Sequence, residues 1–297
     1  MRRLRGLAAG SATAVIVTLV GLTIGLALLS SKNQELVTAN TAIQQRNQQI
    51  KAQNQEIQRE RDKAQENYET STRLSAQLAA RRGQWNEVLR VVDRAIAEEH
   101  QDPVGLRLVR VKALYGLIHT EECRDEIKSL FELKDKAGYD AEIDLWYGDM
   151  ALLQHDADSA KEHIQRAIDA GLPEAEEAYA RSLLEPNTAK VVELLNSALE
   201  EDAFHQRAYQ YLIANLIMLG RRGEARGKIE LGRTLFPDDG NIVLLNAWLL
   251  AMNGDSDRSI ATLQELQPVL EDKDYRLAER LFRGLAKYVN TMDHWER

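Results

Sequence analysis

The stretch GRRGEARGKIELGRTLFP, residues 220–237, decides the fold of this chain. Small, large and turn-forming residues follow one another in it at Gly220, Ala225, Ile229, Gly232 and Pro237. The same phase returns 34 residues later, at Gly254, Leu263 and Leu266. Repeats of this length are typical of stacked helix pairs, because small residues let two helices approach while larger apolar residues fill the groove beside them.

The rest of the chain follows the same helical pattern. Its 297 residues include only 5 prolines, and the apolar residues are spaced by three and four rather than alternating. We therefore predict an all-α protein. The single cysteine, Cys123, cannot form an intrachain disulfide, so the thiol content does not indicate a compartment.

Six helix pairs fit residues 71–273. The junctions between successive pairs fall near Asp102, Tyr139, Leu172, Asp202, Asp238 and Asp272. The repeat residues of the first and third pairs are Ala76, Val88, Val92 and Ala95, and Gly148, Ala160, Ile164 and Ala167. We place the turn of the first pair at Gly83. Residues 274–297 are expected to form a capping helix and tail, whose apolar stripe closes the open end of the stack with Leu277, Leu281, Leu285 and Tyr288.

Over about residues 69–273 these repeats resemble those of tetratricopeptide (TPR) proteins. The resemblance implies an α-solenoid that binds a protein or peptide in a concave groove. Carried over position by position, it implies a groove formed by Leu145, Asp149, Leu152, Gln210, Ala214, Ile217, Leu244, Trp248 and Met252. Trp248 is the best candidate for an anchor, although a tryptophan at helical spacing also commonly packs between repeats. The paired Lys and Asn with which some relatives hold an acidic C-terminus are not evident.

Residues 7–29 contain no charged side chain, and 23 helical residues span roughly 34 Å, enough for a hydrocarbon core of about 30 Å. Arginines crowd the basic tail, residues 1–6, so we predict a single-pass transmembrane helix with a cytoplasmic N-terminus. The rest of the chain would then lie outside the cell membrane, on the periplasmic side. The alternative is a cleaved secretory signal, but such signals have shorter apolar cores and a small-x-small cleavage site.

Residues 32–70 carry a seven-residue repeat that predicts a coiled-coil stalk. Its seam has asparagine at a positions and Leu or Ile at d positions: Asn33, Leu36, Asn40, Ile43, Asn47, Ile50, Asn54 and Ile57. A buried asparagine at an a position pairs with its counterpart, which favours a parallel homodimer at some cost in stability. The alternative is a solitary helical spacer. No Gly or Pro lies between Lys32 and Arg82, so the helix is expected to run rigidly into the first repeat.

The first 80 residues also resemble the region after the kinase domain in bacterial transmembrane Ser/Thr protein kinases. An arginine-rich flank, an apolar span ending in GLTIGLALL (residues 21–29) and a polar stalk reaching RERDKAQENYETS (residues 59–71) carry this likeness. The chain has no Gly-rich phosphate loop, no HRD and no DFG motif, so the kinase domain is absent. The resemblance implies at most the sensor half of such a protein.

Charge and motifs exclude several classes of function. Residues 1–70 hold 9 Lys and Arg against 6 Asp and Glu, and the remaining residues hold 29 against 40, which argues against nucleic acid as a partner. His119 and Cys123 have metal-ligand spacing but lack further ligands, and His155 and His163 are interpreted as surface residues beside a helix start at Asp156 or Asp158. We predict no metal, no cofactor and no catalytic set.

The sequence therefore predicts a membrane-anchored scaffold that binds another protein, and not an enzyme. Two alternatives stay open. One is an envelope chaperone or quality-control adaptor that recruits unfolded chains. The other is an extracytoplasmic sensor or relay module of a kinase-like signalling system.

Overall fold

The computed structural model describes the backbone of residues 2–98, 103–133, 138–268, 270 and 272–295. The side chains of residues 2–21, 23–25, 272, 288 and 290–295 lie outside the description. Within the described residues the chain consists of helices and the turns that join them, with no strand, so the predicted all-α class is confirmed. The chain divides into two compact units, residues 1–67 and 68–297.

The first unit consists of one helix, the N-terminal part of α1 (Arg2–Arg81). Every side chain from Leu26 to Asn67 is exposed, because this unit has no second element to pack against. Among the side chains that the structure describes, we find no helix with the length and apolarity needed to span a membrane. The predicted transmembrane segment, residues 7–29, lies outside that set except for Leu22 and residues 26–29.

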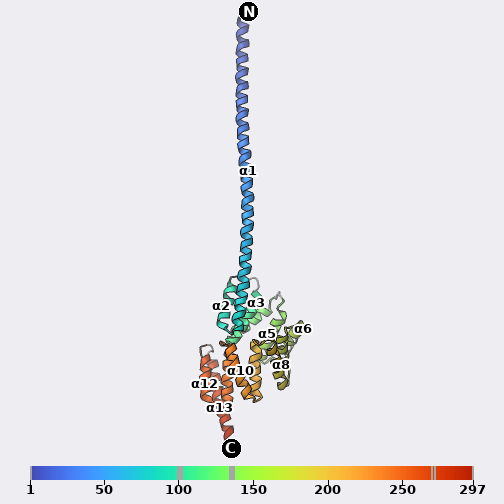
Figure 1. Ribbon diagram of the computed structural model, residues 1–297, viewed down its shortest axis with the longest axis vertical. Helices are drawn as coiled ribbons and strands as arrows, with labels where there is room; N and C mark the ends of the chain where they lie inside the picture. Colours follow the sequence, from blue (N-terminus) through green and yellow to red (C-terminus); the bar gives the residue numbers. More distant parts are fainter. Residues whose placement is uncertain (1, 99–102, 134–137, 269, 271, 296–297) are drawn as a thin grey trace. The chain divides into compact units, whose positions relative to one another are not determined.

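The second unit is a series of helix hairpins (Figure 1). The last turns of α1 pair with α2 (Trp85–Ala97), and the next hairpins are α3 (Pro103–Gly116) with α4 (Thr120–Phe131), α5 (Asp140–Leu153) with α6 (Ala157–Ala170), α7 (Glu174–Leu184) with α8 (Thr188–Glu201), α9 (Gln206–Met218) with α10 (Arg222–Leu235), and α11 (Gly240–Met252) with α12 (Ser256–Leu263). A short 3-10 turn, η1 (Gln264–Leu266), and the helix α13 (Asp272–Trp295) follow. The first helix of each later pair begins close to its predicted junction.

The small repeat residues allow the two helices of a hairpin to pack closely. Gly148 of α5 faces α6 so closely that an added Cβ would lie 2.5 Å from a side-chain carbon of Ile164. Ala160, Ile164 and Ala167 are fully buried in the same contact. The helix start is also settled, because the side chain of Asp156, rather than Asp158, accepts the Ser159 N–H at 3.1 Å.

The hairpin stack curls back on itself, so distant repeats touch as well as neighbouring ones. Gly83 O, in the first turn, accepts the Asp238 N–H at 3.4 Å, and the rings of Trp85 and Phe236 stack with centroids 6.4 Å apart. Asn241 donates to Tyr115 O at 2.8 Å. An ideal solenoid contacts only its nearest neighbours, so these contacts tie the first two repeats to the last two.

Gly83 is the residue that permits this closure. Its φ is +62°, and an added Cβ would lie 2.2 Å from the Cα of Phe236. A larger residue would therefore be both strained in its backbone and blocked by the neighbouring chain. The turn predicted at Gly83 is present, but it has a second role that spacing did not reveal.

The cap helix packs with a different face from the one predicted. Tyr275, Ala278 and Phe282 of α13 pack on a cluster formed by Val243, Ala247, Leu263 and Leu266. Leu277 and Leu281, which were expected to close the stack, are 49% and 60% exposed. The prediction was wrong for these two residues because α13 has apolar residues on two faces, and the face with Tyr275 and Phe282 fills the end of the stack. Leu285 is partly buried, and the side chain of Tyr288 lies outside the described residues.

Candidate partner-binding cleft

A cleft of about 380 Å³ opens on the inner side of the second unit. Its walls come from the last turns of α1, the start of α2, and parts of α3, α5, α7 and the start of α9. Five successive repeats thus contribute to one surface. In such a stack the inner surface is formed mainly by the first helix of each pair, which accounts for this composition.

One wall of the cleft is a polar face of α1. Arg73, Gln77 and Arg81 line it at successive spacings of four residues, which places them on one side of the helix. All three are exposed, and neither arginine has an ion-pair partner among the described residues. This wall therefore presents two guanidinium groups that have no carboxylate within ion-pair distance among the described residues.

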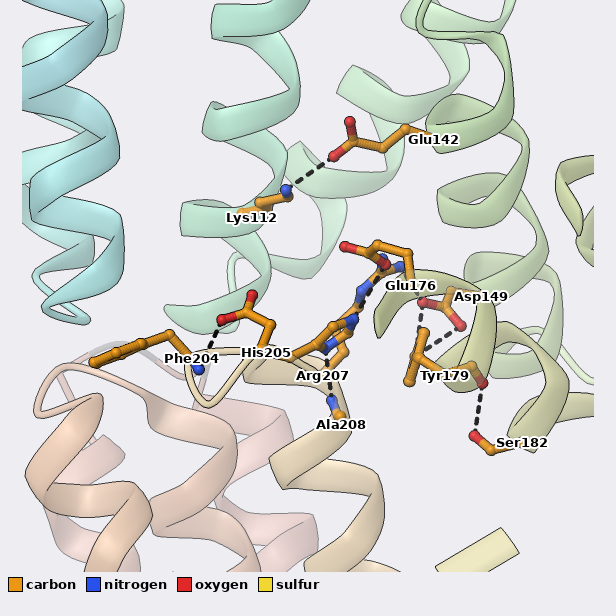
Figure 2. Close-up of polar contacts among 11 residues, drawn as sticks. Lys112, Glu142, Asp149, Glu176, Tyr179, Ser182, Phe204, His205, Arg207 and Ala208 are labelled. Carbon is orange, nitrogen blue, oxygen red and sulfur yellow. Dashed lines mark hydrogen bonds and ion pairs between the residues drawn. The ribbon is translucent and has the colours of Figure 1, made fainter. Parts of the chain in front are cut away.

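The floor is built around the buried Arg207, which is only 3% exposed (Figure 2). Its two terminal nitrogens lie 2.6 Å from Asp149 Oδ2 and 2.6 Å from Glu176 Oε2. The guanidinium carbon lies 4.0 Å from the ring centroid of Trp146 and 4.7 Å from that of Tyr179. Ion pairs and aromatic faces together compensate for the loss of water around the cation.

The charges of this floor are set by burial and by one another. Burial lowers the pKa of Arg207, but Glu176 and Asp149 outweigh it and the pKa is raised above its ordinary value. Burial alone would raise the pKa of Glu176, but the charge of Arg207 outweighs burial, and the pKa lies well below its ordinary range. For Asp149 burial prevails over Arg207, and the pKa is raised. Tyr179 Oη donates to both Asp149 oxygens, at 3.0 and 2.9 Å.

A second ion pair lies in the cleft between α3 and α5. Lys112 Nζ is 2.9 Å from Glu142 Oε1 (Figure 2). Burial would lower the pKa of Lys112, but Glu142 and Glu176 outweigh it, and the pKa is raised. Lys112 is therefore a charged residue that is already paired.

His205 fixes the rim where α9 begins. Its Nδ1 accepts the Ala208 N–H at 3.1 Å and caps the helix, while Nε2 lies 3.2 Å from Glu176 Oε2 (Figure 2). Because Nδ1 is an acceptor, the neutral ring carries its proton on Nε2, toward the carboxylate. The next residue outward, Phe204, is 43% exposed, and its backbone N–H donates to Asp202 Oδ1 at 3.0 Å. The rim thus holds an accessible aromatic ring in place.

Two tryptophans contribute to the walls of the cleft. Trp85 and Trp146 line it, and both side chains are buried, at 3% and 1% exposure. Their indole N–H groups have no hydrogen-bond acceptor in the part of the chain that the structure describes, although buried indole N–H groups usually find one. Because these nitrogens are enclosed by the protein, the tryptophans contribute apolar surface to the cleft.

The groove residues predicted from the TPR resemblance do not line this cleft. Four of them are almost entirely buried: Leu145, Asp149, Gln210 and Ile217. The other five are partly buried: Leu152, Ala214, Leu244, Trp248 and Met252. Trp248 and Met252 pack against the main core, which agrees with the packing alternative for that tryptophan.

The curling of the stack explains this difference. Gln210 donates to Asp239, and Arg207 reaches back from α9 to Asp149 on α5, so inner faces that would line an open groove contact each other instead. The prediction that the four buried residues face a partner is therefore wrong: they make contacts within the chain. The accessible part of the inner surface lies at the first repeats instead. Sequence reasoning missed it, although the spacing of Arg73, Gln77 and Arg81 by four residues was a signal that could have indicated it.

The stalk seam lies in the first unit. Its d-position side chains Leu36, Ile43, Ile50 and Ile57 are half to two-thirds exposed, and the four seam asparagines are exposed as well. Nothing else in that unit is available to cover them. Pairing of the seam with a second chain remains a prediction.

The histidine and cysteine predictions have mixed outcomes. His163, expected at the surface, is buried, with Nδ1 2.7 Å from Asp144 Oδ1, because Tyr147 and Phe131 pack around its ring. Burial raises the pKa of the Cys123 thiol to about 12. Among the described residues, no group of three or more His, Cys, Asp or Glu side chains is arranged to hold a metal ion.

Comparison with known proteins gives structural likeness only. No family model matches the chain, and no curated protein matches it. A tetratricopeptide repeat protein from Parabacteroides merdae is similar with 15% identity and a TM-score of 0.42, over 74% of this chain and 84% of that one. The TPR2AB domain of yeast Sti1, solved in complex with pHSP90, has 14% identity and a TM-score of 0.34, over 74% and 98%. The repeat assignment rests on the spacing and hairpin packing described above.

Proposed function

We propose that this chain is a membrane-anchored scaffold that binds a protein or peptide partner in the cleft of its repeat domain. The observation that carries the proposal is the contrast within the cleft. Arg207 and Lys112 are fully engaged by internal carboxylates, whereas Arg73, Gln77 and Arg81 face the opening without partners. Polar side chains left unsatisfied on a concave surface are what a binding site offers to a ligand.

Affinity capture with the full-length chain tests this proposal. Gln77→Trp places a bulky neutral side chain in the cleft, and we expect it to remove a captured partner that the native chain retains. Lys161→Trp, on an exposed position of α6 outside the cleft, should capture that partner normally. Equal capture by both variants would refute the cleft as the binding site.

The anchor is proposed to be residues 7–29, with the N-terminus in the cytoplasm and the repeat domain on the periplasmic side. The charge-free apolar segment behind Arg2, Arg3 and Arg5 supports this orientation. The full-length chain should stay with membranes after an alkaline carbonate wash, and a chain lacking residues 2–30 should not. Release of the full-length chain by the wash would contradict anchoring.

The stalk is proposed to pair two chains in parallel. Four asparagine layers alternate with four Leu or Ile layers, and only an in-register partner lets each asparagine meet its counterpart. A single cysteine at Ile43 should form a rapid disulfide between chains, while one at Gln45, on the outer face of the heptad, should not. Native Cys123 is buried and serves as an internal control. Equal rates at the two positions would favour the solitary spacer.

A further inference from the structure

We propose that the segment held in the cleft is an extended, acidic stretch of peptide, two of whose carboxylates bind Arg73 and Arg81. This inference rests on the proposed function, because it names the chemistry of the partner that the cleft would take. The ion pairs of the cleft and the spacing of the two arginines support it.

Two of the basic residues that line the cleft lack an ion-pair partner. Four basic side chains line the cleft, namely Arg73, Arg81, Lys112 and Arg207. Arg207 is held by two carboxylates at 2.6 Å, and Lys112 by one at 2.9 Å, so neither has charge to offer a ligand. The remaining acidic lining residue, Asp202, accepts a backbone N–H at the rim and keeps its negative charge, so the inference rests on the position of the unpaired arginines and not on the net charge of the cleft. Only Arg73 and Arg81 are left as cations without a partner.

The spacing of these two residues suits an extended chain. Eight helical residues separate them, which is roughly 12 Å along α1 at 1.5 Å per residue. An extended peptide covers that distance in about four residues at roughly 3.3 Å each. Two acidic side chains three or four positions apart could therefore reach both guanidinium groups. Gln77, midway between the arginines, can bond the backbone of such a segment with its amide.

The rim of the cleft adds an apolar contact. Phe204 is nearly half exposed there. The indole nitrogens of Trp85 and Trp146 are enclosed by the protein, so they are not counted as donors to a ligand. A peptide with acidic and apolar residues would match both the two arginines and this ring.

The net charge of the whole chain, in contrast, does not favour an acidic partner. Its net charge is −8, which alone would favour a basic partner. Salt, however, screens exposed charges beyond about 8 Å at physiological ionic strength, so the contacts within the cleft decide the preference. The distant acidic surface is then expected to slow association of an acidic peptide more than it weakens the complex.

Peptide binding to the full-length chain in detergent micelles tests the inference. The probes are three fluorescein-labelled ten-residue peptides on a Gly/Ser background, with Glu, Gln or Lys at two positions four residues apart. Fluorescence anisotropy should show the Glu peptide bound about tenfold more tightly than the Gln peptide, and the Lys peptide most weakly. Two exposed charge contacts provide roughly this factor. The preference should shrink as salt is added.

Charge-reversed variants supply the decisive comparison. The double change Arg73→Glu and Arg81→Glu should reverse the order of the Glu and Lys peptides. The matched control, Lys161→Glu with Arg222→Glu, lowers the net charge equally at exposed positions outside the cleft and should keep the native order. Thermal unfolding followed by circular dichroism verifies that both double variants are folded, which their exposed sites predict.

Two sets of outcomes separate this inference from the function on which it rests. If the Glu and Gln peptides bind equally, if no peptide binds, or if the charge-reversed chain keeps the native order, the acidic segment is wrong. Partner capture that is lost in Gln77→Trp would still uphold the cleft as a binding site. Capture that is indifferent to Gln77→Trp would remove the proposed function itself.

Discussion

The stalk and the repeat domain are both helical, but they differ in how much of their side-chain surface is buried. From Leu26 to Asn67 every side chain of the stalk is exposed, including the seam isoleucines. In the repeat domain, by contrast, even charged residues such as Arg207 and Asp149 are buried against other repeats. Most apolar residues of the repeat domain are buried within the chain, whereas those of the stalk can be covered only by something outside it.

This difference determines whether a mutation changes the stability of the fold or the association of the chain with another molecule. Changes at buried positions of the repeat domain should act on the stability of a single chain, because the contacts of those positions are internal. Changes in the stalk should act on association and leave the unfolding of the repeat domain alone.

Arg207→Ala should cost the repeat domain about 3–5 kcal/mol of unfolding free energy. It leaves the buried Asp149 without its cation and Glu176 with only His205 and Lys112 nearby, which is far worse than losing an exposed pair. Urea unfolding followed by circular dichroism measures the change. Arg181→Ala, which breaks the exposed Arg181–Glu177 pair on α7, is the control and should cost under about 1 kcal/mol. Similar losses in the two variants would contradict the buried cluster.

Asp239→Asn should flatten the pH dependence of stability. Burial raises the pKa of Asp239 from 3.8 to about 6, so the folded protein binds this proton more tightly than the unfolded chain. Its stabilising contribution is complete below about pH 4 and is lost as the pH rises through 6, a change on the order of 3 kcal/mol. Asparagine avoids this loss and still caps α11.

The surroundings of Asp239 can accept the amide. Gln206 and Gln210 both donate to the carboxylate, and Gln210 Oε1 is buried without a donor. Rotation of the Gln210 amide would let that oxygen accept from the new NH₂ group. Urea midpoints measured from pH 4 to 8 should therefore vary less in the variant. A steeper dependence than in the native chain would show that Asp239 is not the titrating group.

Lys51→Glu should strengthen a parallel stalk dimer by about 1 kcal/mol in total. In the proposed register Arg46 at g faces Lys51 at e of the other chain, a like-charge contact on each side that the change makes attractive. Sedimentation equilibrium of the detergent-solubilised chain measures the effect. A solitary spacer would show no change in association, and a shift in repeat-domain unfolding would break the separation of the two regions.

Leu281→Ser should have the smallest effect, within about 0.5 kcal/mol, because its side chain is 60% exposed. Phe282→Ser, one residue along α13, should cost clearly more because that ring packs on the end of the stack. Thermal unfolding compares the two. Equal losses of stability would contradict the packing face described for α13 and favour the stripe predicted from the sequence.

Local patterns predicted the helices well because each depends on residues close in sequence. The spacing of Gly148, Ala160 and Ile164 describes a contact within one hairpin, and Asp156 caps a helix three residues from its partner. The cleft could not be read in the same way. Arg207 meets Asp149 across 58 positions and Asn241 meets Tyr115 across 126, so the curl that buries the expected groove is set by contacts that no local period contains.

A photo-crosslinking amino acid placed at Gln77 of the full-length chain in native membranes tests the account most directly. We predict one discrete crosslinked partner from this position and none from the same group at Lys161, with the adduct lost on addition of excess Glu-containing peptide. Adducts of equal yield from both positions, or an adduct from Lys161 alone, would contradict the cleft as the place where a partner binds.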